Sequence, residues 1–202
     1  SSDRGVAMTS PSARTVRRTA EPSGPATLHD ARRRLGFYLR ALWDDGRELR
    51  GFPAKGRDAR PFVSPQGIHL PDAIRDAGRE AGDARYRAAV AHGAAPLGFP
   101  GPPESRAGLT GGAIVLVGVL EDARVERLAC RALPGLRRLW LRFHTTDAGA
   151  ALTFESLAAR LARGLLDPAY VDADPWIASA RRRFDEAAGA LSDAAFVRPL
   201  AL

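Results

Sequence analysis

The chain has 202 residues, 45% of them hydrophobic, and a formal net charge of +7. That length supports a substantial core in one domain, while 20 glycines and 15 prolines indicate short elements with many breaks. Lys55 is the single lysine, and the arginines are interspersed with acids, without a basic patch interleaved with aromatic residues; we therefore expect no nucleic-acid partner. The longest apolar run, 113–120, falls short of the roughly 20 residues of a membrane span, so no membrane insertion is expected.

The N-terminal segment, residues 1–26, consists largely of Ser, Pro, Arg and Gly. It has too few aliphatic side chains to offset the entropy of ordering, and we expect a disordered tail. It also lacks the apolar stretch of a secretory signal. The single cysteine, Cys130, cannot form an internal disulfide and lies in an apolar helix, so we expect a core thiol in a reducing, cytoplasmic setting.

The remaining residues, 27–202, are predicted to form a single, mainly α domain with a short extended or hairpin segment. Apolar residues at helical spacing, capping side chains and proline breaks predict six or so helices. The expected helices cover 28–43, a weaker one beginning at Pro71–Asp72, 83–95, 112–133, 136–144, 153–166 and 175–190.

Two places between these helices have distinct patterns. Residues 44–62 have turn chemistry throughout, and RPFVSPQGIHL, ending at Leu70, has β-type residues broken by proline and glycine. We expect a short hairpin or two extended edges there, with His69 exposed at an edge. Pro96 is expected to end the 83–95 helix.

The central helix changes character at Glu121, where an apolar run meets the sequence EDARVER. Acids joined to a buried run are costly unless they are paired, so we expect arginines of the same helix or a partner from elsewhere to meet them. His92 is expected as a half-buried partner of Glu121 or Asp122. This set forms either a packing device or a docking surface. The candidate cluster comprises Glu121, Asp122, Arg124, Glu126, Arg127 and His92.

Few catalytic constellations are compatible with the residues present. There is no phosphate-binding loop followed by lysine, and no serine in a nucleophile elbow. A zinc site is conceivable from His92, Glu121 or Asp122, and His144 or His69. A helical zincin motif, however, needs glutamate directly after the first histidine and a second histidine four residues on, where this chain has Gly93 and Pro96. We therefore predict a non-enzyme with neither metal nor cofactor. The weak metal candidates are His92, Glu121 and His144.

Four blocks of the sequence resemble a known family. They are GIHLPDA (67–73), YRAAVAHGAA (86–95), VLEDARVERLACRALPGLRRLW (119–140) and LARGLLDPAYVDADPWIASARRRFDEA (161–187). Together they are similar to the N-terminal region of the nitric oxide reductase activation proteins of the NorD type, relatives of the CbbO-type subunit of a rubisco activase. The resemblance extends over about residues 28–200.

This resemblance implies a non-enzymatic adaptor that works with a hexameric MoxR-type AAA+ ATPase to remodel or activate a metalloenzyme such as nitric oxide reductase or rubisco. In the family, a von Willebrand factor type A domain follows this region and recognises the client. The chain ends where that domain would begin, so we expect an N-terminal fragment or a truncated homologue. The alternative hypothesis is a degenerate zincin-like metal-binding domain or hydrolase.

Overall fold

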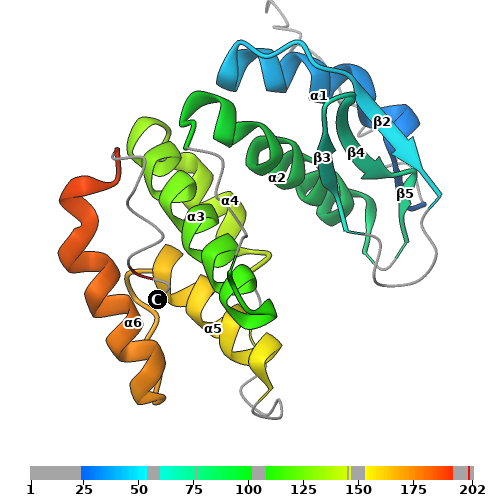
Figure 1. Ribbon diagram of the computed structural model, residues 1–202. Coiled ribbons are helices and arrows are strands. Elements are labelled where there is room, and N and C mark those ends of the chain that lie inside the picture. The colour runs from blue at the N-terminus through cyan, green and yellow to red at the C-terminus, as the bar shows by residue number, and fades with distance from the viewer. Residues whose placement is uncertain are drawn as a thin grey trace, which may run out of the picture.

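The computed structural model describes residues 24–53, 60–75, 77–101, 108–144, 146, 153–192 and 200. In these residues the chain is mainly helical, with two small sheets, as predicted (Figure 1). No helix among them has the length and hydropathy of a membrane-spanning segment. The helices are α1 (Leu28–Trp43), α2 (Arg79–Gly98), α3 (Gly111–Ala132), α4 (Gly135–Leu141), α5 (Phe154–Leu166) and α6 (Pro175–Glu186), followed by the 3-10 helix η1 (Ala187–Ala190).

The N-terminal half, residues 24–101, packs both sheets against helices α1 and α2 (Figure 1). Its three-stranded sheet has the order β2-β4-β3, with β2 parallel and β3 antiparallel to β4; strands β1 and β5 form a separate antiparallel pair. The core between these elements includes Leu35, Leu39, Leu70 and Val90. The strands are β1 (Ala26–Thr27), β2 (Leu49–Phe52), β3 (Phe62–Ser64), β4 (Gly67–Pro71) and β5 (Ala73–Ile74).

The C-terminal half, residues 108–192, is helical in its described parts. Helix α3 packs on α5, and α5 packs on α6, around Leu161, Ile177 and Phe184. A further apolar cluster connects the two halves, because Ala91 of α2, Ala129 of α3 and other small residues pack against each other and against α4. Small side chains allow helix axes to approach closely, so the alanine-rich face of α2 explains this contact. Cys130 lies in this cluster, where burial raises the pKa of its thiol to about 11, and the expectation of a core cysteine is confirmed.

Most helix predictions are confirmed with their caps. The Thr27, Thr153 and Asp174 side chains accept hydrogen bonds from the first turns of α1, α5 and α6. The hairpin expected before residue 71 is present as β3 and β4. The expected tail, 1–26, falls outside the described residues except for 24–26, where Ala26 is buried and pairs with Ile74.

Several predictions of the elements are wrong. Strand β2 lies in the stretch assigned to turns, and β5 replaces the weak helix expected after Pro71; both are short strands that depend on pairing with distant partners. Helix α2 begins at Arg79, ahead of the expected cap Asp83, and continues beyond Pro96 to Gly98. Proline removes one intrahelical hydrogen bond and crowds the carbonyl four residues earlier, and α2 continues for only two residues beyond it.

His69 is also not at an exposed edge. It lies on β4, the middle strand of its sheet, where its ring stacks on Phe62 with centroids 4.3 Å apart. Its Nε2 atom is 2.9 Å from the Ser64 hydroxyl. The edge prediction was wrong because β2, which covers the other side of β4, was not anticipated.

A buried arginine connects the C-terminal half to the end of α2. Arg124 is 2% exposed, and its guanidinium donates two hydrogen bonds of 2.7 Å to the Glu121 carboxylate. It also donates to the carbonyl oxygens of Phe99 (2.8 Å) and Leu191 (3.1 Å), so α3 is joined both to the end of α2 and to the residue after η1. Gly101 lies against this ion pair, and a Cβ atom there would be 2.7 Å from a Glu121 oxygen.

We predict that Arg124→Met lowers the free energy of unfolding by about 3 kcal/mol, because it leaves a carboxylate and two carbonyl oxygens without their donor. Urea denaturation measures this change. The matched control is Arg138→Met on α4, where the side chain is exposed and the same loss of charge is expected to cost less than about 0.5 kcal/mol. Equal free energies of unfolding for the two variants would contradict the structural role of Arg124.

Candidate functional site

A cleft of about 1300 Å³ lies between the two halves and contains the site. One wall is formed by β3 and α2, and the other by α3, α5 and the residues that follow α4. Its titratable lining includes His92, Asp122, Glu126 and His144. Residues from three separate segments of the chain are thus brought to one cavity by the packing of α2 against α3 and α4.

Glu126 is the centre of this group. Its side chain is 3% exposed, and one oxygen, Oε1, lies 3.3 Å from His92 Nδ1 and 3.1 Å from His144 Nε2. Carboxylates are rarely buried without partners, and here two imidazoles from different segments supply them. Asp122, one turn earlier on α3, is more exposed, and its Oδ1 atom lies 3.9 Å from His92 Nε2. His92 therefore lies between two carboxylates.

These contacts determine the charge states at the floor of the cleft. Burial opposes protonation of His92, but the hydrogen bond to Glu126 and the negative charges of Asp122 and Glu126 outweigh it and raise the pKa of His92 to about 8. Burial alone would raise the pKa of Glu126, whereas the hydrogen bonds from His144 and His92 keep it below its ordinary value. At neutral pH the pair is an imidazolium facing a carboxylate.

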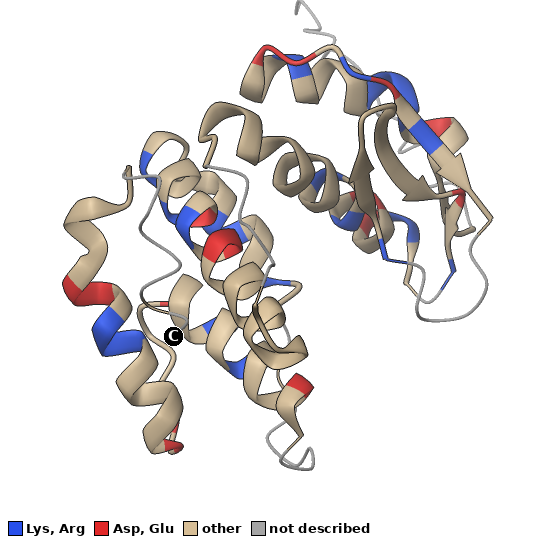
Figure 2. Cartoon of the chain, viewed as in Figure 1, with Lys and Arg blue, Asp and Glu red and all other residues tan. Residues whose placement is uncertain are grey.

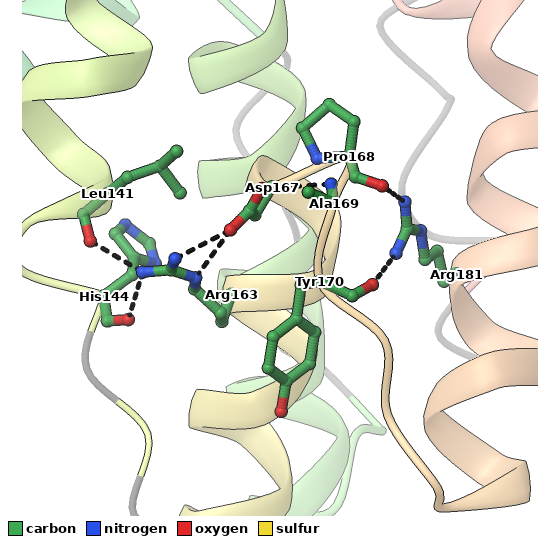
Figure 3. Close-up of polar contacts among 8 residues, drawn as sticks. All are labelled: Leu141, His144, Arg163, Asp167, Pro168, Ala169, Tyr170 and Arg181. Carbon is green, nitrogen blue, oxygen red and sulfur yellow. Dashed lines mark hydrogen bonds and ion pairs between the residues drawn. The ribbon is translucent and has the colours of Figure 1, made fainter.

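His144 is positioned by an arginine of α5. Figure 3 shows the Arg163 guanidinium reaching the end of α4, where it donates hydrogen bonds to the carbonyl oxygens of Leu141 (2.7 Å) and His144 (3.0 Å). Asp167 orients this guanidinium through contacts of 2.7 and 3.1 Å to one carboxylate oxygen. Asp167 begins the segment that connects α5 to α6. Arg181 of α6 holds this segment too, because its guanidinium donates hydrogen bonds to the carbonyl oxygens of Pro168 and Tyr170 (Figure 3). The backbone that carries His144 is therefore held by α5.

The residues around His92 explain why a zincin motif is absent from α2. A Cβ atom on Gly93 would lie 3.0 Å from Val63 Cγ2 and 3.6 Å from Ile68 Cγ2, so the sheet leaves almost no room for the glutamate of such a motif. Pro96 has no N–H with which to bond the His92 carbonyl four residues earlier. The geometry of α2 thus favours a histidine that pairs with carboxylates.

The cluster predicted from the sequence divides into three contacts. Glu121 pairs with the buried Arg124, which also bonds the Phe99 carbonyl; His92 contacts Asp122 and Glu126; and Arg127 pairs with Asp185 of α6. Figure 2 shows acidic and basic segments side by side on α3 and on α6. Two of the predicted residues, Arg124 and Glu126, are the charged side chains classed as buried in the described part of the chain.

Sequence reasoning missed the pairing of Glu126 with His144 and the role of Arg163. One signal for the first was present: Asp122 and Glu126 are four residues apart and share a helix ridge, so a histidine reaching one is close to the other. The role of Arg163 depends on hydrogen bonds to two backbone carbonyl oxygens. Because every residue has a carbonyl oxygen, no pattern of residue types in the sequence predicts these contacts.

Of the three weak metal candidates, His92 and His144 are in the cleft, whereas Glu121 faces Arg124. Within the ranges that the structure describes, no group of three or more His, Cys, Asp or Glu side chains is arranged to hold a metal ion. The Glu121 carboxylate is paired with the Arg124 guanidinium at 2.7 Å, so it is not available as a metal ligand.

No protein-family model, curated protein or solved structure matches this chain.

We predict that the pairing of His92 makes stability depend on pH. The pKa of His92 is about 8 in the fold against an ordinary value of 6.5, so its contribution is complete below about pH 6.5 and is lost as the pH rises through about 8. The elevation corresponds to about 2 kcal/mol, which solvent screening of a side chain that is 42% exposed reduces to about 1 kcal/mol.

Urea denaturation at about pH 6 and about pH 9 measures this effect in the wild type and in His92→Gln. We expect the free energy of unfolding to fall by about 1 kcal/mol more in the wild type than in the variant. His29→Gln, an exposed histidine on α1, is the matched control and is expected to retain the wild-type difference. The same pH dependence in all three proteins would contradict the ion pair.

Proposed function

We propose that this chain is a non-enzymatic adaptor that works with a MoxR-type AAA+ ATPase to remodel or activate a metalloenzyme, such as nitric oxide reductase or rubisco. The proposal draws on the resemblance of four sequence blocks to the NorD- and CbbO-type proteins. It places the protein in the cytoplasm and assigns it no cofactor.

One observation supports this proposal most strongly: the residues that define the resemblance have structural roles. The EDARVER segment supplies the buried Arg124 and Glu126, and the block PGLRRLW supplies Trp140, whose indole N–H donates a 3.1 Å hydrogen bond to the Ala88 carbonyl of α2. These contacts join α2, α3 and α4. A chain that shares these residues is expected to share the arrangement of these helices, because buried polar groups require their partners.

The site itself favours a role without catalysis. Glu126, the most buried acid of the cleft, has both histidines directed at one of its oxygens, and His92 is paired with a second carboxylate. A general base must reach a substrate proton, whereas here Oε1 of Glu126 is contacted by His92 of α2 and by His144, which follows α4. These contacts connect α2 and the residues after α4 to α3, which supports a structural role for the cluster.

Co-purification of the full chain with the MoxR-type ATPase of the same genome tests the proposal. We expect a stable complex in size-exclusion chromatography and a changed rate of ATP hydrolysis. Arg124→Met, which loosens the contact between α2 and α3, is expected to weaken the change in hydrolysis, while Arg138→Met leaves it intact. No co-elution and no effect of the wild-type chain on hydrolysis would overturn the adaptor assignment.

The second candidate is the degenerate zincin-like metal-binding domain. It is favoured by the two imidazoles and two carboxylates in one cleft, and opposed by Gly93, Pro96 and the histidine contacts of Glu126. Elemental analysis of the purified chain separates the candidates. The adaptor proposal predicts far less than one equivalent of zinc, unchanged by His92→Ala; about one equivalent, lost in that variant, would support the metal-binding domain instead.

A further inference from the structure

The outer face of the three-stranded sheet carries aromatic side chains. Side chains alternate between the two faces of a strand, so the strand register places Phe52, Phe62 and His69 on one face, opposite the buried side chains of β4. Strands β2 and β3 lie on either side of β4, about 10 Å apart. The ring centroids of Phe52 and Phe62 are nevertheless 5.7 Å apart. The two side chains therefore lean toward each other over the middle strand.

The Phe62 ring is stacked on one of its faces and open elsewhere. It lies on the His69 ring with centroids 4.3 Å apart and planes within 5° of parallel. The His69 ring is itself held by the contact of its Nε2 atom with the Ser64 hydroxyl, at 2.9 Å. Phe62 is still 51% exposed. The sheet thus presents a preformed stack of two rings, and a further planar ring extends that stack on the open face of Phe62.

A free amide donor lies in the turn next to this stack. The Ser64 hydroxyl donates a 2.8 Å hydrogen bond to Oε1 of Gln66, which is an exposed residue of the β3–β4 turn. The amide nitrogen of Gln66 has no hydrogen-bond partner among the residues that the structure describes. Amide side chains of this kind bind the edges of nucleobases that are stacked on aromatic rings.

Two arginines flank the stack. Arg60 precedes Phe62 by two residues; it is exposed and forms no ion pair within the described part of the chain. Arg50 lies beside His69 in the register of β2 and β4 and pairs with Glu48 at 2.8 Å. Both members of that pair are exposed, and such pairs are weak, so a phosphate group can replace Glu48.

The net charge of this half of the chain has the sign that a polyanion requires. Residues 24–101 contain 13 arginines and lysines against nine aspartates and glutamates, an excess of four positive charges. This count includes every acid of the segment, whichever arginine it pairs with. The excess attracts phosphate groups to the half of the protein that carries the sheet.

We propose that the outer face of this sheet binds single-stranded nucleic acid, with a base stacked on Phe62 and phosphate groups on Arg50 and Arg60. The expectation of no nucleic-acid partner considers only neighbours along the chain, where basic and aromatic residues are not interleaved. Strand pairing interleaves them in space, because Arg50, His69 and Phe62 form one row across β2, β4 and β3. The proposal does not rest on the adaptor function.

Fluorescence anisotropy with labelled oligonucleotides tests the proposal on the full chain. The probe is a strand of about ten thymidine nucleotides at about 50 mM salt. Its matched control is an abasic strand of the same length, which keeps the sugars and phosphates and lacks the bases. We expect saturable binding of the thymidine strand and at least about tenfold weaker binding of the abasic strand, because stacking needs a base.

Two pairs of variants separate stacking from charge. Phe62→Leu keeps an apolar side chain and removes the ring, so it is expected to weaken the thymidine strand by about tenfold and to leave the abasic strand unchanged. Its control, Phe37→Leu on α1, alters a ring that is 57% exposed and is expected to bind as the wild type does.

Arg60→Gln is expected to weaken both strands by the same factor and to reduce the slope of log affinity against log salt by about 0.7, since one phosphate contact is lost. Arg138→Gln, an exposed arginine of α4, is its control and is expected to retain the wild-type slope. All four variants are at exposed positions, and circular dichroism checks that each is folded.

Three outcomes would overturn the proposal. They are no binding of the thymidine strand at about 0.1 mM protein, equal affinities for the thymidine and abasic strands, and equal affinities for Phe62→Leu and Phe37→Leu. Co-elution with the ATPase in the absence of oligonucleotide binding would retain the adaptor and overturn the nucleic-acid site. Base-dependent binding without co-elution would retain the nucleic-acid site and remove the adaptor.

Discussion

The burial of the Glu126 carboxylate is the constraint on which the arrangement of the two halves depends. A carboxylate that is nearly inaccessible to water is stable only with donors in fixed places, and His92 and His144 provide them from α2 and from the residues after α4. Arg163 in turn fixes the backbone of His144 from α5. A chain of polar contacts therefore runs from the sheet-bearing half into the helical half, and the cleft is the space that these contacts leave between them.

On the opposite side of α3 a buried cation, Arg124, is stabilised by acceptors in fixed places, as the Glu126 anion is stabilised by donors. Arg124 and Glu126 are two residues apart, so they project about 200° from each other around the helix axis. The guanidinium binds Glu121 and two carbonyl oxygens at the ends of α2 and η1, while the carboxylate binds imidazoles. One helix thus carries two buried ions facing different neighbours, and its rotation and axial position are both fixed.

Much of this fold can be predicted from local sequence, and the predictions that failed concern elements that depend on contacts with distant residues. Apolar periodicity with Thr27, Thr153 and Asp174 as caps was sufficient to place α1, α5 and α6, because these signals act within one turn. Strand β2 has no alternating pattern and exists through pairing with β4, some 20 residues later. The site shows the same limit of local sequence. The residue types and the ridge of acids on α3 predicted that His92 contacts an acid of that helix. They did not predict that His144 contacts the same acid, because that contact depends on how α4 packs.

The position of Trp140 has a consequence for how the cleft can be observed. Its indole lies edge-on to the His92 ring with centroids 6.0 Å apart, and it is 3% exposed. A protonated imidazole quenches indole emission at such short range, whereas a neutral one quenches it far less. The other two tryptophans, Trp43 and Trp176, are in other surroundings, one bonded to the Ala91 carbonyl and the other 41% exposed. The protein thus contains an intrinsic optical reporter on the protonation of the residue at the floor of its cleft.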